Sequence, residues 1–181
     1  MKVIFLDIDG VLNTSETFIK RKQDWEKTGI WNLEIDEFRV EYLKRIIDET
    51  EAKVVLSSAW RRDFENVSGK VIPIHEKGEA LQNILKKYDI ELYDILRKGY
   101  SLLREDLITI WLNEHPDVES FIIIDDATTH LKRFIGKELI KTSFLADGVM
   151  LQNMDDCMGL CEDHIDIAIK KLNKCKVKKL T

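Results

Sequence analysis

The 181-residue chain has little of what marks fibrous, low-complexity or disulfide-rich proteins. It contains only eight glycines, two prolines and three cysteines. So little glycine and proline excludes collagen-like and low-complexity chains. An odd number of cysteines does not suit a secreted disulfide scaffold, and a chain of this length can bury a full core without disulfides. We therefore expect reduced cysteines and a single domain over residues 1–181.

The sequence also lacks a membrane segment and a strong charge of one sign. No run approaches the ~20 apolar residues of a membrane span. Asp7 and Asp9 interrupt the first apolar run where a signal peptide would need continuous apolar residues. These absences predict a cytoplasmic protein with no membrane partner. The net charge of −5 gives no sign of an obligatory nucleic-acid partner. The lysines of residues 170–179 could bind phosphates locally, although a solvated helix end is the simpler interpretation.

Three short apolar runs each lead directly into polar residues. The runs are residues 3–6, 53–56 and 121–124. Apolar runs without alternation are typical of strands that are covered on both faces. Amphipathic helical patterns lie between them, over residues 36–48, 79–88 and 101–114. This alternation predicts an α/β fold with a doubly wound parallel sheet.

The polar residues after the three runs should meet, because ligands of such sheets bind beyond the carboxyl ends of the strands. Cleaving a phosphate ester needs a positioned nucleophile, charge neutralisation and a proton source. Asp7 can supply a carboxylate nucleophile and form an aspartyl-phosphate. Asp9 can protonate the leaving oxygen and then deprotonate the attacking water. A turn or cap role for this acid pair is disfavoured, because two buried acids without a charge partner would be costly.

A magnesium ion is the predicted charge partner of these acids, because it prefers hard oxygen ligands. Asp7 and Asp125 are the expected side-chain ligands. Asp126 either joins through water or orients a ligand, or instead forms the N-cap of a helix over residues 127–132.

Hydroxyl and basic side chains complete the predicted phosphate site. Ser57 can hold a phosphoryl oxygen, and Ser58 can share that task or cap the next helix. Arg104, at the start of a predicted helix, can balance the charge of the transferring group. Lys98 and Arg97 are nearby alternatives for this role.

Together these segments resemble the haloacid dehalogenase (HAD)-like phosphatases. Residues 5–12 (FLDIDGVL), 54–57 (VVLS) and 122–126 (IIIDD) look like the first, second and fourth motifs, with Arg104 as the basic residue of the third. The resemblance implies a Rossmann-like core, an aspartyl-phosphate mechanism, and Mg²⁺ held by Asp7, Asp125 and the Asp9 backbone carbonyl. Residues 57–61 (SSAWR) are similar to phosphatase domains of nucleic-acid repair proteins, including polynucleotide kinase-phosphatases.

The expected substrates are nucleotides, nucleic-acid ends or other phosphorylated small molecules. Arg61 could touch a substrate phosphate and Trp60 could stack on a base, or Trp60 packs in the core and Arg61 forms surface pairs. No large cap domain fits between the motifs. Residues 13–35 form either a small flap over the site or a surface helix with its connection. No kinase P-loop is present, so the sequence encodes no fused kinase activity.

Two other functions and one other metal site remain open. A signalling receiver domain also carries acids after its first strand, but it usually places its acid pair on a different strand from the phosphorylated Asp. A non-catalytic nucleic-acid-binding module is the third hypothesis. Cys157, Cys161 and His164 are spaced i, i+4 and i+7, which suits core packing on one helical face as well as zinc.

Overall fold

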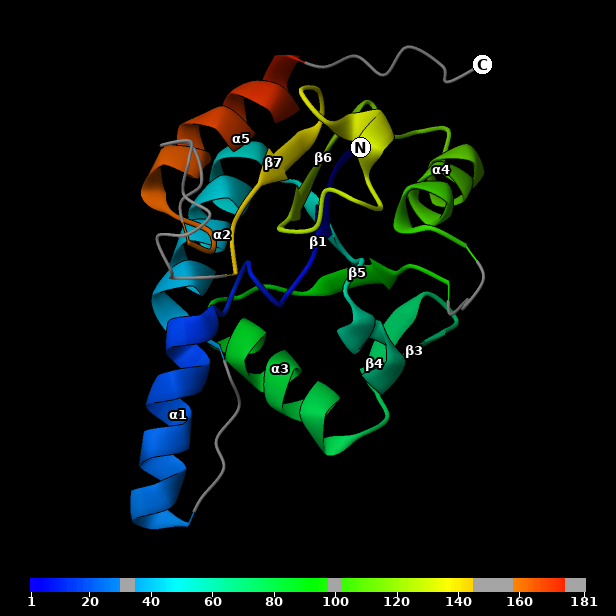
Figure 1. Ribbon diagram of the computed structural model, residues 1–181. Coiled ribbons are helices and arrows are strands. Elements are labelled where there is room, and N and C mark those ends of the chain that lie inside the picture. The colour runs from blue at the N-terminus through cyan, green and yellow to red at the C-terminus, as the bar shows by residue number, and fades with distance from the viewer. Residues whose placement is uncertain (30–34, 98–101, 145–157, 175–181) are drawn as a thin grey trace.

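The computed structural model describes residues 1–29, 35–97, 102–144 and 158–174 (Figure 1). Five strands form a sheet in the order β5-β2-β1-β6-β7, and every pairing in it is parallel. The strands are β1 (Lys2–Leu6), β2 (Lys53–Leu56), β5 (Leu92–Ile95), β6 (Ser120–Asp125) and β7 (Leu139–Lys141). The doubly wound α/β fold predicted from the sequence is confirmed.

Helices cover both faces of this sheet. They are α2 (Glu37–Thr50), α3 (Glu76–Lys87), α4 (Arg104–Glu114) and α5 (Glu162–Lys174), with the short 3₁₀ helix η2 (Lys132–Phe134). Helix α1 (Ser15–Thr28) stands away from the sheet (Figure 1), and a second 3₁₀ helix, η1 (Ala59–Asp63), follows β2. One face packs against α2, α3 and α5, and the other packs against α4 and η2. The central strands β1 and β6 are therefore buried along their length, which explains their unbroken apolar runs.

The long amphipathic patterns predicted their helices well. The patterns over residues 36–48 and 79–88 correspond to α2 and α3. The predicted start of α4 at residue 101 is wrong, because the helix begins at Arg104 after Leu103 in an extended conformation. Residue 101 itself lies outside the described residues. The shift matters because it places Arg104 in the first turn of α4.

Several short elements were not predicted. An antiparallel hairpin, β3 (Phe64–Val67) with β4 (Lys70–Pro73), follows η1, and β5 and β7 complete the edges of the sheet. Each of these strands has only three or four residues. Runs this short carry too little periodicity to distinguish a strand from a loop.

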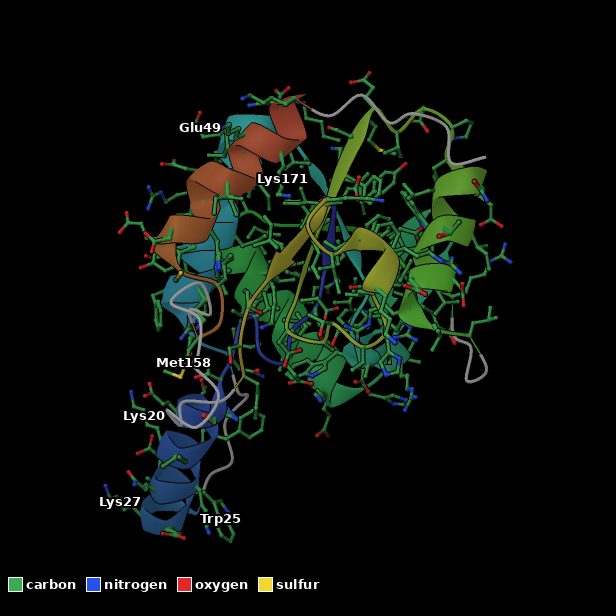
Figure 2. The ribbon with its side chains drawn as sticks, turned by 45° about the horizontal axis from the view of Figure 1, so that its top comes forward. Lys20, Trp25, Lys27, Glu49, Met158 and Lys171 are labelled. Carbon is green, nitrogen blue, oxygen red and sulfur yellow. The ribbon has the colours of Figure 1, made fainter. Side chains whose placement is uncertain are left out.

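Much of the predicted flap segment, residues 13–35, forms α1. This helix stands away from the sheet, with Lys20, Trp25 and Lys27 extending from it (Figures 1 and 2). The Trp25 side chain is 47% exposed, so it is not a core residue. Residues 30–34 lie outside the described residues, and a flap function stays a prediction. No described helix has the length and apolar character needed to cross a membrane.

Candidate active site

Strand register brings Asp7, Ser57 and Asp125 to the same level at the carboxyl end of the sheet. Leu6 pairs with Leu56 on β2 and with Ile124 on β6, and each of the three polar residues comes next in its chain. The Asp7 amide donates to the Ile124 carbonyl at 3.0 Å, and the Ser57 amide donates to the Leu6 carbonyl at 2.9 Å. Side chains alternate along strands, so the three polar groups lie on the face opposite Leu6, where α4 packs.

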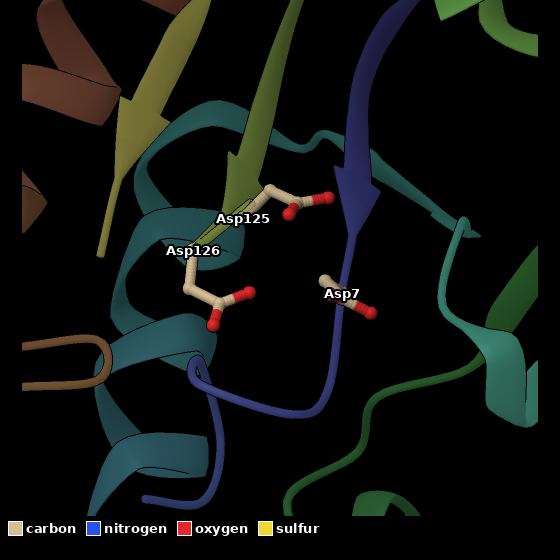
Figure 3. Close-up of side chains that lie close together, drawn as sticks. All are labelled: Asp7, Asp125 and Asp126. Carbon is tan, nitrogen blue, oxygen red and sulfur yellow. The ribbon is translucent and has the colours of Figure 1, made fainter. Parts of the chain in front are cut away.

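Three carboxylates gather at this edge. Asp7 and Asp125 are 4% and 0% exposed, and each offers an oxygen within 4.8 Å of the others and of one from Asp126. Figure 3 shows Asp125 and Asp126 extending from the end of β6 toward the loop that follows β1. Among the described residues, this is the only such group of three His, Cys, Asp or Glu side chains. A set of carboxylate oxygens suits a hard cation such as Mg²⁺.

The loop after β1 needs a glycine where it meets Asp126. Gly10 has φ +74°, and a Cβ added there would lie 2.5 Å from Cγ of Asp126. Any other residue would therefore push the carboxylate away. The alternative that Asp126 caps a helix is wrong, because residues 127–131 are not helical.

Arg104 connects the carboxylates to α4. Its Nη1 lies 2.9 Å from Oδ2 of Asp7 and also donates to Asp125. Burial lowers the pKa of Arg104, but Asp7 and Asp125 outweigh this and raise it above its ordinary value. The rival Arg97 is 69% exposed at its side chain and pairs with Glu114 instead. The other rival, Lys98, lies outside the described residues.

The single positive charge of Arg104 does not neutralise the carboxylates of this cluster. Burial and the neighbouring Asp7 raise the pKa of Asp125 to about 7, although Arg104 opposes the shift. The same two causes raise the pKa of Asp126 to about 6. The cluster therefore favours an added proton or an added cation at neutral pH.

The two serines after β2 have different surroundings. The Ser57 hydroxyl is buried and has no hydrogen-bond partner among the described residues. A buried hydroxyl without a partner is unfavourable, so Ser57 is free to bond a ligand oxygen. Ser58 instead caps η1, where its Oγ accepts from the Trp60 amide at 3.4 Å. Of the two roles considered for Ser58, the structure favours the cap.

Arg61 lies behind the serine loop. Its Nη1 donates to the carbonyls of Ser57 at 3.1 Å and Ser58 at 2.8 Å. Burial lowers the pKa of Arg61, and Arg104 and Arg62 lower it further, whereas Asp7 raises it. Arg61 therefore lies within electrostatic reach of the acidic cluster. Its contact with a substrate phosphate stays a prediction.

Asp9 is held by two neighbours that the sequence did not link to it. The Trp60 indole Nε1 donates to Asp9 Oδ2 at 2.9 Å, and Asn13 Nδ2 donates to Oδ1 at 3.0 Å. Trp60 is 3% exposed and belongs to the core, so its ring is not open to stack on a base. The sequence holds one indication of the contact with Trp60, which is that a tryptophan stands in a polar stretch just after the end of a strand.

The cysteine and histidine residues show no zinc site within the described chain. Cys161 precedes α5, so the helical face predicted for it with His164 is not formed. Its Sγ still lies 3.5 Å from Nδ1 of His164, which is buried, as the core-packing alternative expects. Burial lowers the pKa of His164. Cys157 lies outside the described residues.

Comparison with known proteins gives one match. The model of the family described as "HAD domain in Swiss Army Knife RNA repair proteins" matches residues 3–150. This range includes the Asp7 loop, the serine loop, Arg104 and the acid pair after β6. Neither the curated proteins nor the solved structures gave a significant match.

Proposed function

This chain belongs to the family of HAD domains in Swiss Army Knife RNA repair proteins, and from that premise we propose that it is a magnesium-dependent phosphatase of nucleic-acid ends or nucleotides. The observation that best supports the proposal is the convergence of Asp7, Arg104 and the unpartnered Ser57 hydroxyl at one sheet edge. That edge offers a nucleophile, a cation and a free donor for one phosphate group.

The acidic cluster fits the metal that this function needs. Asp7, Asp125 and Asp126 would hold Mg²⁺, together with the backbone carbonyl of Asp9. Once bound, the ion supplies Lewis-acid stabilisation of the charge on the phosphoryl oxygens. The raised pKa values of Asp125 and Asp126 support this fit, because burial and the neighbouring Asp7 disfavour their ionised forms more than Arg104 stabilises them.

In the proposed reaction, a carboxylate oxygen of Asp7 attacks phosphorus while the bond from phosphorus to the leaving oxygen breaks. Asp9 gives a proton to that leaving oxygen. A water molecule then attacks the aspartyl-phosphate and passes a proton to Asp9. The Asp7–phosphate bond breaks, and the carboxylate and inorganic phosphate are regenerated. Arg104 and Ser57 neutralise and hold the phosphoryl oxygens throughout.

The nucleic-acid substrate class rests on the family description and on the lack of a large insertion among the described residues. Between β2 and α4 the described chain adds only η1, the short β3–β4 hairpin, α3 and β5. A site without a large cover admits bulky phosphate esters such as oligonucleotide ends.

The test is phosphate release from 3′- and 5′-phosphorylated RNA and DNA oligonucleotides, mononucleotides and sugar phosphates, with Mg²⁺ and with chelator. We expect turnover only with Mg²⁺, fastest on one class of oligonucleotide end. Asp7→Asn should abolish it, while exchange of the exposed Asp117 for Asn serves as the matched control. Release by Asp7→Asn at the wild-type rate would refute the mechanism, and equal rates on all substrates would refute the nucleic-acid assignment. A receiver domain would accept one phosphate from acetyl phosphate without turnover.

A further inference from the structure

Both carboxylate oxygens of Asp9 accept hydrogen bonds from neutral side chains. Trp60 Nε1 lies 2.9 Å from Oδ2, and Asn13 Nδ2 lies 3.0 Å from Oδ1. Asn13 is also fixed in turn, because its Oδ1 accepts from the Gly10 amide at 3.1 Å. The orientation of Asp9 is therefore set from two directions, one within its own loop and one from the loop after β2.

The Trp60 side chain is itself held in place. Its ring packs in the core beneath η1, and Lys77 Nζ of α3 lies 3.7 Å from the ring centroid. Helix α3 can approach η1 this closely because of Gly78, where an added Cβ would lie 2.4 Å from the Asp63 carbonyl oxygen. The attraction between this cation and the ring face helps to hold the indole, and with it the N–H, in its place beside Asp9.

From this geometry we propose that Trp60 is a positioning residue for the acid–base step of Asp9, with Lys77 reinforcing the position of the Trp60 ring. The inference rests on the proposed function, because it assigns Trp60 a part in that same reaction. Trp60 keeps its own proton throughout. The proton that reaches the leaving oxygen comes from Asp9, and the proton that Asp9 regains comes from the attacking water.

A second tryptophan–aspartate pair provides a matched control. Trp111 Nε1 donates to Asp94 Oδ2 at 2.6 Å, and Trp111 is 4% exposed, compared with 3% for Trp60. Asp94 lies in β5 and not in the loops after β1 and β6, and it belongs to no acidic cluster among the described residues. The residue type, burial and kind of acceptor are the same, but only Trp60 bonds the proposed acid.

The experiment compares Trp60→Phe with Trp111→Phe on two substrates. One is an alkyl phosphate, whose leaving oxygen needs a proton, and the other is p-nitrophenyl phosphate, whose leaving group departs unprotonated. General acid catalysis contributes about 10²–10⁴-fold. Rates are compared as kcat/KM, which reports the step in which the leaving group departs and not the later hydrolysis of the aspartyl-phosphate. We expect Trp60→Phe to lower kcat/KM on the alkyl ester about 30-fold, and on p-nitrophenyl phosphate by less than about threefold, because misplacing the acid loses part of that factor. Trp111→Phe should leave the ratio of the two rates unchanged.

The proposal is overturned if Trp60→Phe lowers both rates by the same factor, or if Trp111→Phe changes the ratio as much. Lys77→Met provides a second test that spares the core, because Lys77 is exposed. It should lower the alkyl-ester rate about twofold to threefold and leave the p-nitrophenyl phosphate rate unchanged, and an unchanged ratio would count against reinforcement by Lys77. The alkyl ester used is the phosphorylated oligonucleotide end that wild type cleaves fastest. Wild-type protein that releases phosphate from no oligonucleotide end or nucleotide would instead refute the proposed function, so this failure is distinguishable from failure of the proposal for Trp60.

Discussion

Two arginines hold aspartates inside this molecule, but their surroundings differ. Arg39 of α2 is 6% exposed, and its Nε lies 3.0 Å from Asp36 Oδ2. Its Nη1 donates to the carbonyls of Met158 and Leu160 at 2.5 and 2.9 Å. One carboxylate and two carbonyls satisfy this guanidinium. Arg104 instead faces two buried carboxylates, with Asp126 beside them.

The contrast separates a charge that is balanced within the fold from one that is surrounded by excess acid. Arg39 links α2 to the segment before α5, and that segment closes over it at Gly159, where an added Cβ would lie 2.5 Å from Arg39 Nη1. Asp36 is its paired carboxylate, and Asp36 also interacts electrostatically with Arg21, so acids are not in excess here. The acids around Arg104 outnumber it, and burial of such an excess is unfavourable without a ligand. Perturbed pKa values cluster at functional sites, and the carboxylates around Arg104 show such perturbation.

The largest expected effect comes from removing Arg104, the arginine that we propose binds the transferring phosphoryl group. Arg104→Ala should lower kcat for phosphate release about 10³-fold, because loss of a cation that stabilises a transferring phosphoryl group costs about 10³–10⁵. Steady-state assays on the best oligonucleotide substrate measure this. Arg97→Ala is the matched control, since Arg97 is exposed and pairs with Glu114, and it should change kcat by less than about twofold. A loss below tenfold for Arg104→Ala would contradict the assignment.

The structural arginine should give the opposite result. Arg39→Met removes the ion pair with Asp36 and leaves two carbonyls without a donor, so we expect the free energy of unfolding to fall by about 3 kcal/mol. In a chain of this size that lowers Tm by roughly 6–12 °C. Thermal unfolding and kcat at 20 °C measure the two effects separately. Unchanged Tm together with a large loss of kcat would place Arg39 in the functional group and remove the contrast.

The comparison also shows which parts could be read from the sequence. Asp7, Ser57 and Asp125 were predictable because each directly follows a buried strand, and parallel strands bring their carboxyl ends to one edge. Arg104 was found from its place at a helix start, although local pattern left Lys98 and Arg97 open. Its reach to Asp7 depends on how α4 packs on the sheet, which periodicity alone does not specify.

Contacts between distant segments were not predictable. Trp60 and Asp9 are 51 positions apart, and their hydrogen bond arises only when the loops after β1 and β2 lie side by side. In the sequence, Arg39 is one polar position of an amphipathic helix. The carbonyls that it bonds, those of Met158 and Leu160, lie 119 and 121 positions further along the chain. Asp36 occupies the N-cap position of α2, but its side chain accepts from Arg39 and Thr17 and not from an amide of the helix.

The smallest expected effect is the gain in stability of the metal-free protein when Asp125 of the proposed active site is replaced by Asn. The pKa of Asp125 is raised to about 7 in the folded protein, above about 3.9 when unfolded, so the folded state binds more protons between these values. Metal-free wild type should therefore lose stability as pH rises through this window.

Asp125→Asn cannot ionise, so in chelator it should be more stable than wild type by about 1–2 kcal/mol at pH 8, with the difference shrinking toward pH 5. Urea unfolding at both pH values measures this, with Asp117→Asn as the control. Saturating Mg²⁺ should reverse the order, because it stabilises only the protein that binds it. A variant that is less stable at pH 8 in chelator would mean that Arg104 fully compensates Asp125, as Asp36 and its neighbours compensate Arg39.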